Sequence, residues 1–206
     1  MTSRRALFAV ILVVSVGPVR LPAQTSYHVT LGARYTTTLV HDSIVSPLDV
    51  RPDVAPALAG AVDLPLTDPW KLELLADIST SMLRRHDAGG GTAPITRLWM
   101  LGVSVGLRRQ LNPWLEGRAA VGGLKYLPAS SIGLFSAGTG GIMPYGSVAL
   151  DAAPAAFRRR RVALEAGADV HRFLTPALRT TGFTDARVVY RIDLGVRLDL
   201  RRARVP

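Results

Sequence analysis

Apolar and polar residues alternate along most of the chain. Between residues 27 and 39, one face carries Tyr27, Leu31 and Tyr35, whereas the other carries His28 and Arg34. A period of two is the signature of a strand whose two faces meet different surroundings. Alternation of this kind predicts strands over 27–39, 54–66, 70–82, 96–109, 115–125, 141–152, 161–172 and 187–200.

The lengths of these strands and of their connections point to a membrane. A tilted transmembrane strand needs roughly 9 to 11 residues, whereas strands of soluble proteins have most often about 5 or 6. Short links at 67–69, 111–113 and 153–155 alternate with long ones at 41–53, 84–95, 126–140 and 173–185. Such an arrangement is typical of outer-membrane barrels. We therefore predict an all-β chain that forms an eight-stranded, antiparallel, up-and-down transmembrane β-barrel.

Aromatic residues recur at the starts of alternate strands. Their spacing is 43, 44 and 43 residues, at Tyr27, Trp70, Trp114 and Phe157. This is the period of a hairpin repeat, and it places the four rings at the short-turn rim, where aromatic side chains favour the membrane interface. A second girdle nearer the long loops is predicted at Trp99, Tyr35 and Tyr190.

The N-terminus has the pattern of a secretory signal. Arg4 and Arg5 precede an apolar core over 6–16, and Leu21-Pro22-Ala23 resembles a cleavage zone. We predict a signal peptide over 1–23 and a barrel over 24–206. The chain is therefore expected to be exported to the outer membrane after the signal peptide is cleaved. The sequence has no cysteine, so neither disulfides nor a lipid-modified N-terminus is expected.

Basic residues dominate the charge, with a formal net charge of +10. They form no tract interleaved with aromatics, and an exported chain does not meet nucleic acid, so nucleic-acid binding is not expected. Anionic membrane lipids and lipopolysaccharide are the expected partners. The candidate contacts are Arg158 to Arg161, Arg201, Arg202 and Arg204 at the short-turn end, and Arg51, Arg84, Arg85 and Arg179 at the other.

The last predicted strand carries the most specific motif. Asp193, Gly195, Leu198 and Leu200 follow a polar-x-Gly-x-x-apolar-x-apolar pattern. With this strand the chain resembles, over roughly 24–200, the small eight-stranded outer-membrane barrels of the OmpA and OmpX type and the generic outer-membrane β-barrel domain. The resemblance implies that the motif is an assembly signal read by the barrel-insertion machinery. The final position is Leu200, where that family usually has an aromatic residue.

The polar faces carry the candidate functional residues. An eight-stranded lumen is only wide enough to be filled by side chains or to hold one small ligand. Because buried ions need partners, we interpret the inward charges as a plug of ion pairs instead of a pore. The predicted members are Arg34, Asp63, Glu73, Asp77, Arg108, Glu116, Arg118, Asp151, Arg161, Glu165, Asp169, Arg187, Arg191, Asp193 and Arg197.

These features favour a non-enzymatic outer-membrane barrel with a structural or surface-interaction role. A soluble periplasmic carrier of the lipocalin kind is the alternative, and it requires the apolar faces to turn inward. A lipid A-modifying enzyme is a third hypothesis, for which His41-Asp42-Ser43 has the necessary residue types. We predict no catalytic residue, cofactor or metal site, and we expect His171 to form hydrogen bonds in the lumen.

Overall fold

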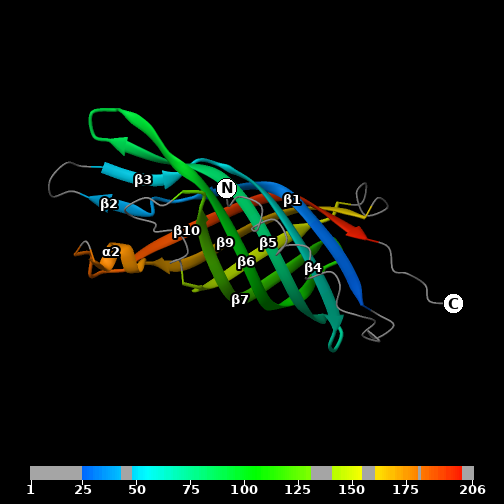
Figure 1. Ribbon diagram of the computed structural model, residues 1–206. Coiled ribbons are helices and arrows are strands. Elements are labelled where there is room, and N and C mark those ends of the chain that lie inside the picture. Colours follow the sequence, from blue (N-terminus) through cyan, green and yellow to red (C-terminus); the bar gives the residue numbers. More distant parts are fainter. Residues whose placement is uncertain (1–24, 43–47, 131–140, 155–160, 181, 201–206) are drawn as a thin grey trace, which may run out of the picture.

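The computed structural model describes residues 25–42, 48–130, 141–154, 161–180 and 182–200. Its main element is a closed ring of long antiparallel strands (Figure 1). The ring strands are β1 (Ser26–Thr36), β4 (Ala55–Pro65), β5 (Trp70–Asp87), β6 (Thr92–Asn112), β7 (Leu115–Pro128), β8 (Met143–Ala152), β9 (Val162–Phe173) and β10 (Arg187–Leu200). Each pairs with the next along the chain, and β10 closes the ring on β1. The predicted eight-stranded, antiparallel, up-and-down barrel is confirmed.

The pleat explains why this sequence forms a barrel with two different faces. Along β5, the buried residues Glu73, Asp77 and Ser79 alternate with the exposed residues Trp70 and Leu74. Successive side chains of a strand point to opposite faces of the sheet, so an alternating sequence sends its charges inward and its aliphatic side chains outward. The soluble-carrier alternative required the reverse orientation, and the structure contradicts it for these strands.

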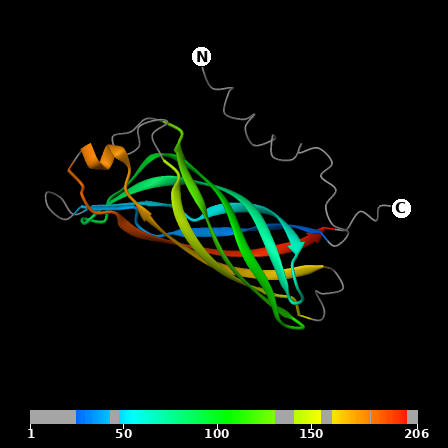
Figure 2. The same ribbon diagram turned by 90° about the horizontal axis from the view of Figure 1, so that it is seen from below.

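Two of the predicted long loops are partly strands. The stretch 41–53 holds a short hairpin of β2 (Val40–Asp42) and β3 (Leu48–Pro52), and β3 pairs with the outer part of β5. The predicted loop at 84–95 is a tall hairpin of β5 and β6 that turns over a run of glycines, where Gly90 has a positive φ of 84°. These strands extend beyond the ring at the end where α2 (Pro176–Thr180) also lies (Figure 1). We call this end the long-loop end and the opposite one the short-turn end; Figure 2 shows both from a second direction.

The interior of the barrel has two chemically distinct parts. Charged side chains fill it at the short-turn end, near the end of β4 and the start of β5. At the long-loop end it is a hydrophobic core, whose buried members are Leu39, Val40, Val50, Ala55, Leu83, Leu98, Met100, Leu124, Tyr126, Met143, Tyr145, Phe173, Leu178 and Val189. We call this set the apolar chamber. The first strand was predicted over 27–39, but β1 ends at Thr36 and Leu39 is buried.

No helix in the part of the chain that the structure describes has the length and apolar character needed to cross a membrane. The predicted signal peptide over 1–23 lies outside the described residues.

Candidate functional site: the charged interior

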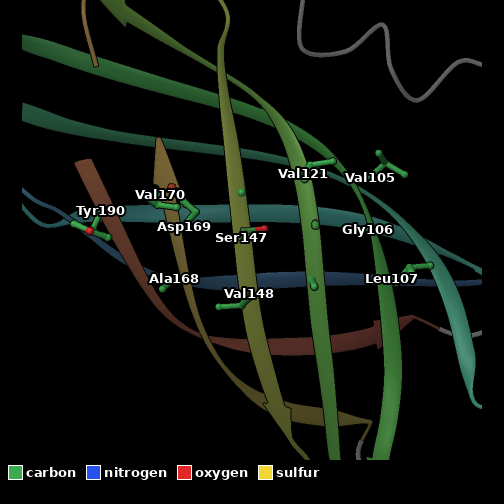
Figure 3. A pocket seen from close by; sticks show the side chains of 13 residues that line it. Val105, Gly106, Leu107, Val121, Ser147, Val148, Ala168, Asp169, Val170 and Tyr190 are labelled. Carbon is green, nitrogen blue, oxygen red and sulfur yellow. The ribbon is translucent and has the colours of Figure 1, made fainter. Parts of the chain in front are cut away.

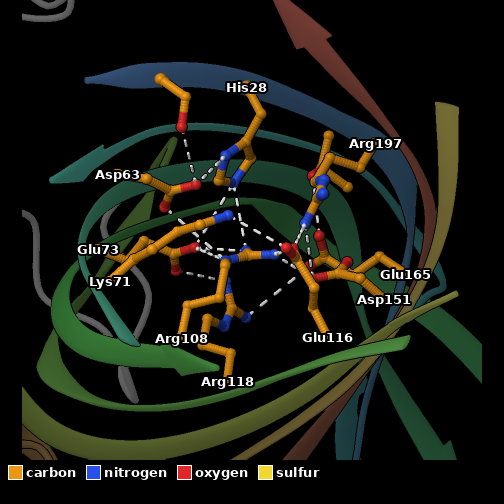
Figure 4. A network of polar contacts seen from close by, with 12 residues as sticks. His28, Asp63, Lys71, Glu73, Arg108, Glu116, Arg118, Asp151, Glu165 and Arg197 are labelled. Carbon is orange, nitrogen blue, oxygen red and sulfur yellow. Dashed lines mark hydrogen bonds and ion pairs between the residues drawn. The ribbon is translucent and has the colours of Figure 1, made fainter. Parts of the chain in front are cut away.

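The charged interior is centred on Arg108 of β6, whose side chain is fully buried (Figure 4). Its Nε donates a hydrogen bond to Glu73 Oε2 at 2.8 Å, and its Nη1 contacts Asp151 and donates to Glu116 Oε2 at 3.3 Å. Asp63 Oδ1 lies 3.8 Å from Nε. A planar guanidinium can satisfy several carboxylates at once, which suits arginine to this position.

A second tier of cations surrounds this centre. Arg197 of β10 donates through Nη1 to Glu116 Oε2 at 3.0 Å and to Asp151 Oδ2 at 2.9 Å. Arg118 of β7 donates to Glu73 Oε1 at 3.1 Å. Its Nη2 lies 3.8 Å from Glu165 Oε1. We call the whole cluster the Arg108 network: His28, Asp63, Lys71, Glu73, Arg108, Glu116, Arg118, Asp151, Glu165 and Arg197.

A smaller cluster lies between the Arg108 network and the apolar chamber. Arg34 binds Asp193 through two hydrogen bonds of 2.7 and 3.1 Å, and it also contacts Asp77. Arg191 Nε lies 2.8 and 2.9 Å from the two carboxylate oxygens of Asp169. Arg191 also stacks over the Tyr145 ring, with 5.3 Å between its Cζ and the ring centroid, so it joins the charged layer to the chamber.

His171 stands at the same boundary. Its Nε2 is 2.9 Å from the Tyr126 hydroxyl, and its Nδ1 is 3.8 Å from Asp169 Oδ1. The edge of the Tyr126 ring packs against Phe173, with 5.3 Å between the two centroids. The histidine therefore has the luminal hydrogen bond that the sequence led us to expect.

The structure brings most of the predicted plug residues together and leaves two of them outside. Arg161 is exposed in the turn before β9, where its φ of 58° ends the strand geometry, and Arg187 is exposed at the start of β10. Neither forms an ion pair with another described residue, so their assignment to the plug is wrong. The residues inside are Arg34, Asp63, Glu73, Asp77, Arg108, Glu116, Arg118, Asp151, Glu165, Asp169, Arg191, Asp193 and Arg197.

Two members of the Arg108 network were missed as site residues. His28 Nδ1 is 3.5 Å from Asp63 Oδ2, and Lys71 donates to Glu116 Oε1 at 3.1 Å. Both share the polar face of their strands with predicted members, so the alternation itself was the signal that identifies them.

His28, Asp63 and Glu73 also offer three potential metal-ligand atoms within 4.8 Å of one another. A cation placed among them would meet the guanidinium of Arg108, which already contacts Glu73 Oε2. Like charges at this separation repel strongly in a buried site. The arrangement therefore favours an internal ion-pair cluster over a metal centre.

The histidine proposed for catalysis lies at the surface. His41 Nδ1 is 2.8 Å from Asp49 Oδ1, and both side chains are about half exposed. Ser43, the third residue of that hypothesis, lies outside the described residues. Three of the four basic residues predicted to meet lipopolysaccharide at the long-loop end have protein partners: Arg84 pairs with Asp53, Arg85 with Asp87, and Arg51 donates to His86.

The outer face of the ring is apolar. A groove of about 610 Å³ runs over β6 to β10 and is lined by outward-facing aliphatic residues such as Val105, Val121, Val148 and Val170, with Tyr190 at one side (Figure 3). Val121 is 65% exposed and Leu194 is 62% exposed. A continuous apolar surface across several strands is typical of a face that contacts lipid or another protein.

Exposed aromatic residues lie on both sides of this belt. Tyr27, Trp70 and Trp114 lie at the short-turn end, and Trp99 lies on the part of β6 nearer the long loops. Phe157 lies outside the described residues.

The four residues of the predicted assembly motif lie on β10. Asp193 pairs with Arg34, and Leu198 and Leu200 face outward. Gly195 lies opposite Gly32 across the seam between β10 and β1. A Cβ added to Gly32 would come within 2.3 Å of the Leu194 carbonyl oxygen, so the close approach of the two strands requires glycine there.

Comparisons with known proteins agree with this architecture. No family model and no curated protein matches the sequence. The structure of the outer membrane protein AlkL in lipid bilayers aligns with a TM-score of 0.54 and 9% identity, over 89% of this chain and 93% of AlkL. Ail of Yersinia pestis aligns with a TM-score of 0.49 and 10% identity, over 85% of this chain and 99% of Ail. The Neisserial surface protein NspA aligns with a TM-score of 0.47 and 13% identity, over 85% and 99%.

The closed ring, the charged interior and the aliphatic exterior together define the class. The chain has the fold of the small outer-membrane β-barrels, with apolar side chains on the outer face of the ring.

Proposed function

We propose that this protein is a closed, non-enzymatic outer-membrane barrel with a structural or surface-interaction role. In this proposal the long-loop end faces the outside of the cell, as the longer loops of such barrels do. The tall β5–β6 hairpin, extended by β2 and β3, is then the surface presented to the environment.

The observation that carries the proposal is the packing of the Arg108 network. It draws side chains from every ring strand into the centre of the lumen. The cavity beside it, lined by Gly32, Arg34, Arg118 and Glu165 among others, has a volume of about 40 Å³. At about 30 Å³ for each water, this cavity has room for one molecule, which supports a closed lumen.

We also propose the partners that the sequence suggested. Outer-membrane lipids contact the aliphatic belt, and lipopolysaccharide contacts the basic residues of the long-loop end. The barrel-insertion machinery reads β10, whose outer edge residues Leu198 and Leu200 are accessible.

Conductance measurements test whether the barrel is closed. The refolded protein in a planar lipid bilayer is expected to give no stable channel openings, because ion-paired side chains occupy the lumen. The double variant Arg108→Ser/Arg197→Ser removes two of the guanidinium groups at its centre and is expected to give cation-selective openings. Retention of the heat-modifiable shift on gels shows that the variant is folded. Steady openings of the unaltered protein would contradict the proposal.

Mass spectrometry of lipid A tests the absence of enzymatic activity. Cells that overproduce the protein are expected to show the same lipid A masses as cells that carry an empty vector. A new lipid A species that disappears in the His41→Ala variant would instead establish the enzyme hypothesis.

A further inference from the structure

The long-loop end contains a hollow that the proposed function does not use. A cavity of about 270 Å³ opens between the end of β1 with β2 on one side and the connection from β9 through α2 to β10 on the other. It lies against the apolar chamber, because both include Leu39, Val40, Phe173 and Leu178. The cavity thus has a purely hydrophobic floor at the end of the barrel that faces water.

The walls of this cavity are held in place by local hydrogen bonds. Thr175 Oγ1 accepts a bond of 3.2 Å from the Leu178 amide, and the Phe183 amide donates to the Leu178 carbonyl at 3.0 Å. Gly182, with a φ of 95°, lets the chain turn back after α2. Leu178, the buried residue of α2, is therefore fixed over the chamber.

The mouth of the cavity is polar, and two further arginines lie nearby in the sequence outside its lining. Arg187 and Asp185 line it, and His41 is already paired with Asp49. Over residues 172–187, three arginines stand against one aspartate, and the arginines, Arg172, Arg179 and Arg187, are exposed. None of the three forms an ion pair with another described residue, so Arg187 is available to an anion at the mouth.

We propose that this cavity binds a free fatty carboxylate of medium chain length. The chain lies among Leu39, Phe173, Leu178 and Phe183, and the carboxylate meets Arg187. At about 30 Å³ for each water-sized group, the volume holds a chain of roughly nine carbons, which is too few for a lipid with several acyl chains. The site lies at the long-loop end, away from the Arg108 network, so a ligand reaches it without passing through the barrel. A test of this site is therefore independent of whether the lumen is closed.

Photolabelling in nanodiscs tests this site. The full chain in phospholipid nanodiscs is exposed to decanoate with a diazirine at its last carbon, and the labelled peptides are mapped by mass spectrometry. Labels are expected in the peptides containing residues 39–42 and 173–187, together with the unavoidable labels on the lipid-facing belt. Unmodified decanoate is expected to displace the first set, whereas decylamine, of the same length and opposite charge, is not.

Two variants separate a binding site from general lipid contact. Leu178→Trp fills the cavity and is expected to reduce labelling of residues 173–187 at least tenfold, with the belt labels unchanged as an internal reference. Arg187→Gln is expected to weaken displacement by decanoate roughly two- to fivefold, the effect of an exposed ion pair. Arg97→Gln changes an exposed arginine that lines no part of the cavity, and it is expected to behave as the unaltered protein.

Each alternative outcome overturns the proposal. Labels confined to the belt, or labels at 173–187 that persist in Leu178→Trp, show that no fatty chain enters the cavity. Equal displacement by decylamine shows that Arg187 does not select an anionic group. The heat-modifiable gel shift of both variants confirms that the barrel is folded in each comparison.

Discussion

At the scale of single residues, the side of the barrel to which a residue points is predictable and its partner is not. Period-two alternation placed Arg108, Glu73 and Asp151 in the lumen, but their contacts depend on the register of strands far apart in sequence. Arg187 shows the limit of this reasoning. Alternation places it on the same inward face as Arg191, yet it lies at the exposed end of the strand.

Replacement of Arg108 tests how strongly the network depends on one guanidinium. Arg108→Met leaves Glu73 and Asp151 without their main cation in a buried site, and breaking such a pair costs about 3–5 kcal/mol. We expect urea unfolding of the folded barrel, followed by tryptophan fluorescence, to show a loss of this size.

The neighbouring residue provides the matched control. Arg109 is exposed and stacks over Trp70 at 5.1 Å, so Arg109→Met is expected to cost about 1 kcal/mol or less. Equal losses of unfolding free energy in the two variants would contradict the prediction, because they would show that the buried ion pairs of Arg108 add no stability beyond that of an exposed arginine.

At the scale of elements, the sequence predicts strands well where their two faces differ. The predicted strand over 187–200 coincides with β10, because its polar and apolar residues alternate at every position except Val189 and Gly195. Near the long loops the two faces of a strand no longer differ in polarity. Leu98, Trp99, Met100 and Leu101 are all apolar, and of these Leu98 and Met100 are buried in the chamber. The apolar chamber was therefore not predictable from alternation, and neither was the pairing of β3 with β5.

The seam between β1 and β10 gives a prediction at this scale. Gly32→Ala places a methyl group against the backbone of β10 and is expected to lower the fraction of refolded protein that migrates as the compact form on unheated gels. Gly60→Ala on β4, where an added Cβ meets no atom within 4 Å, is the control and is expected to refold as well as the unaltered chain. Normal refolding of Gly32→Ala would show that the seam can widen at little cost.

At the scale of the whole molecule, the aliphatic exterior determines the environment in which the fold is stable. Pairing around the closed ring satisfies the strand backbones, and under the proposed function the apolar outer face lies against lipid. This much was predictable from strand length and alternation, since a barrel with charges inside can expose only its apolar face.

Charged substitutions on the outer face measure the depth of each position in the membrane. Val121 lies in the middle of β7 and is 65% exposed, so Val121→Arg is expected to cost about 2–4 kcal/mol in lipid vesicles. Leu111, near the short-turn end of β6, is expected to tolerate arginine at a cost of about 1 kcal/mol or less. Denaturant titration in vesicles gives both values, and a small cost at Val121 would place the belt outside the bilayer.

The composition of the Arg108 network has a consequence for how the barrel assembles. Its members come from every ring strand, including His28 of β1 and Arg197 of β10, the two strands whose pairing closes the ring. An open sheet cannot form the complete cluster, because Arg108 of β6 contacts Asp151 of β8 and Arg197 of β10 contacts Glu116 of β7, which requires the sheet to curve into the ring. The network therefore makes closure cooperative: a partly formed barrel is penalised electrostatically, and only the complete ring reaches the stable state.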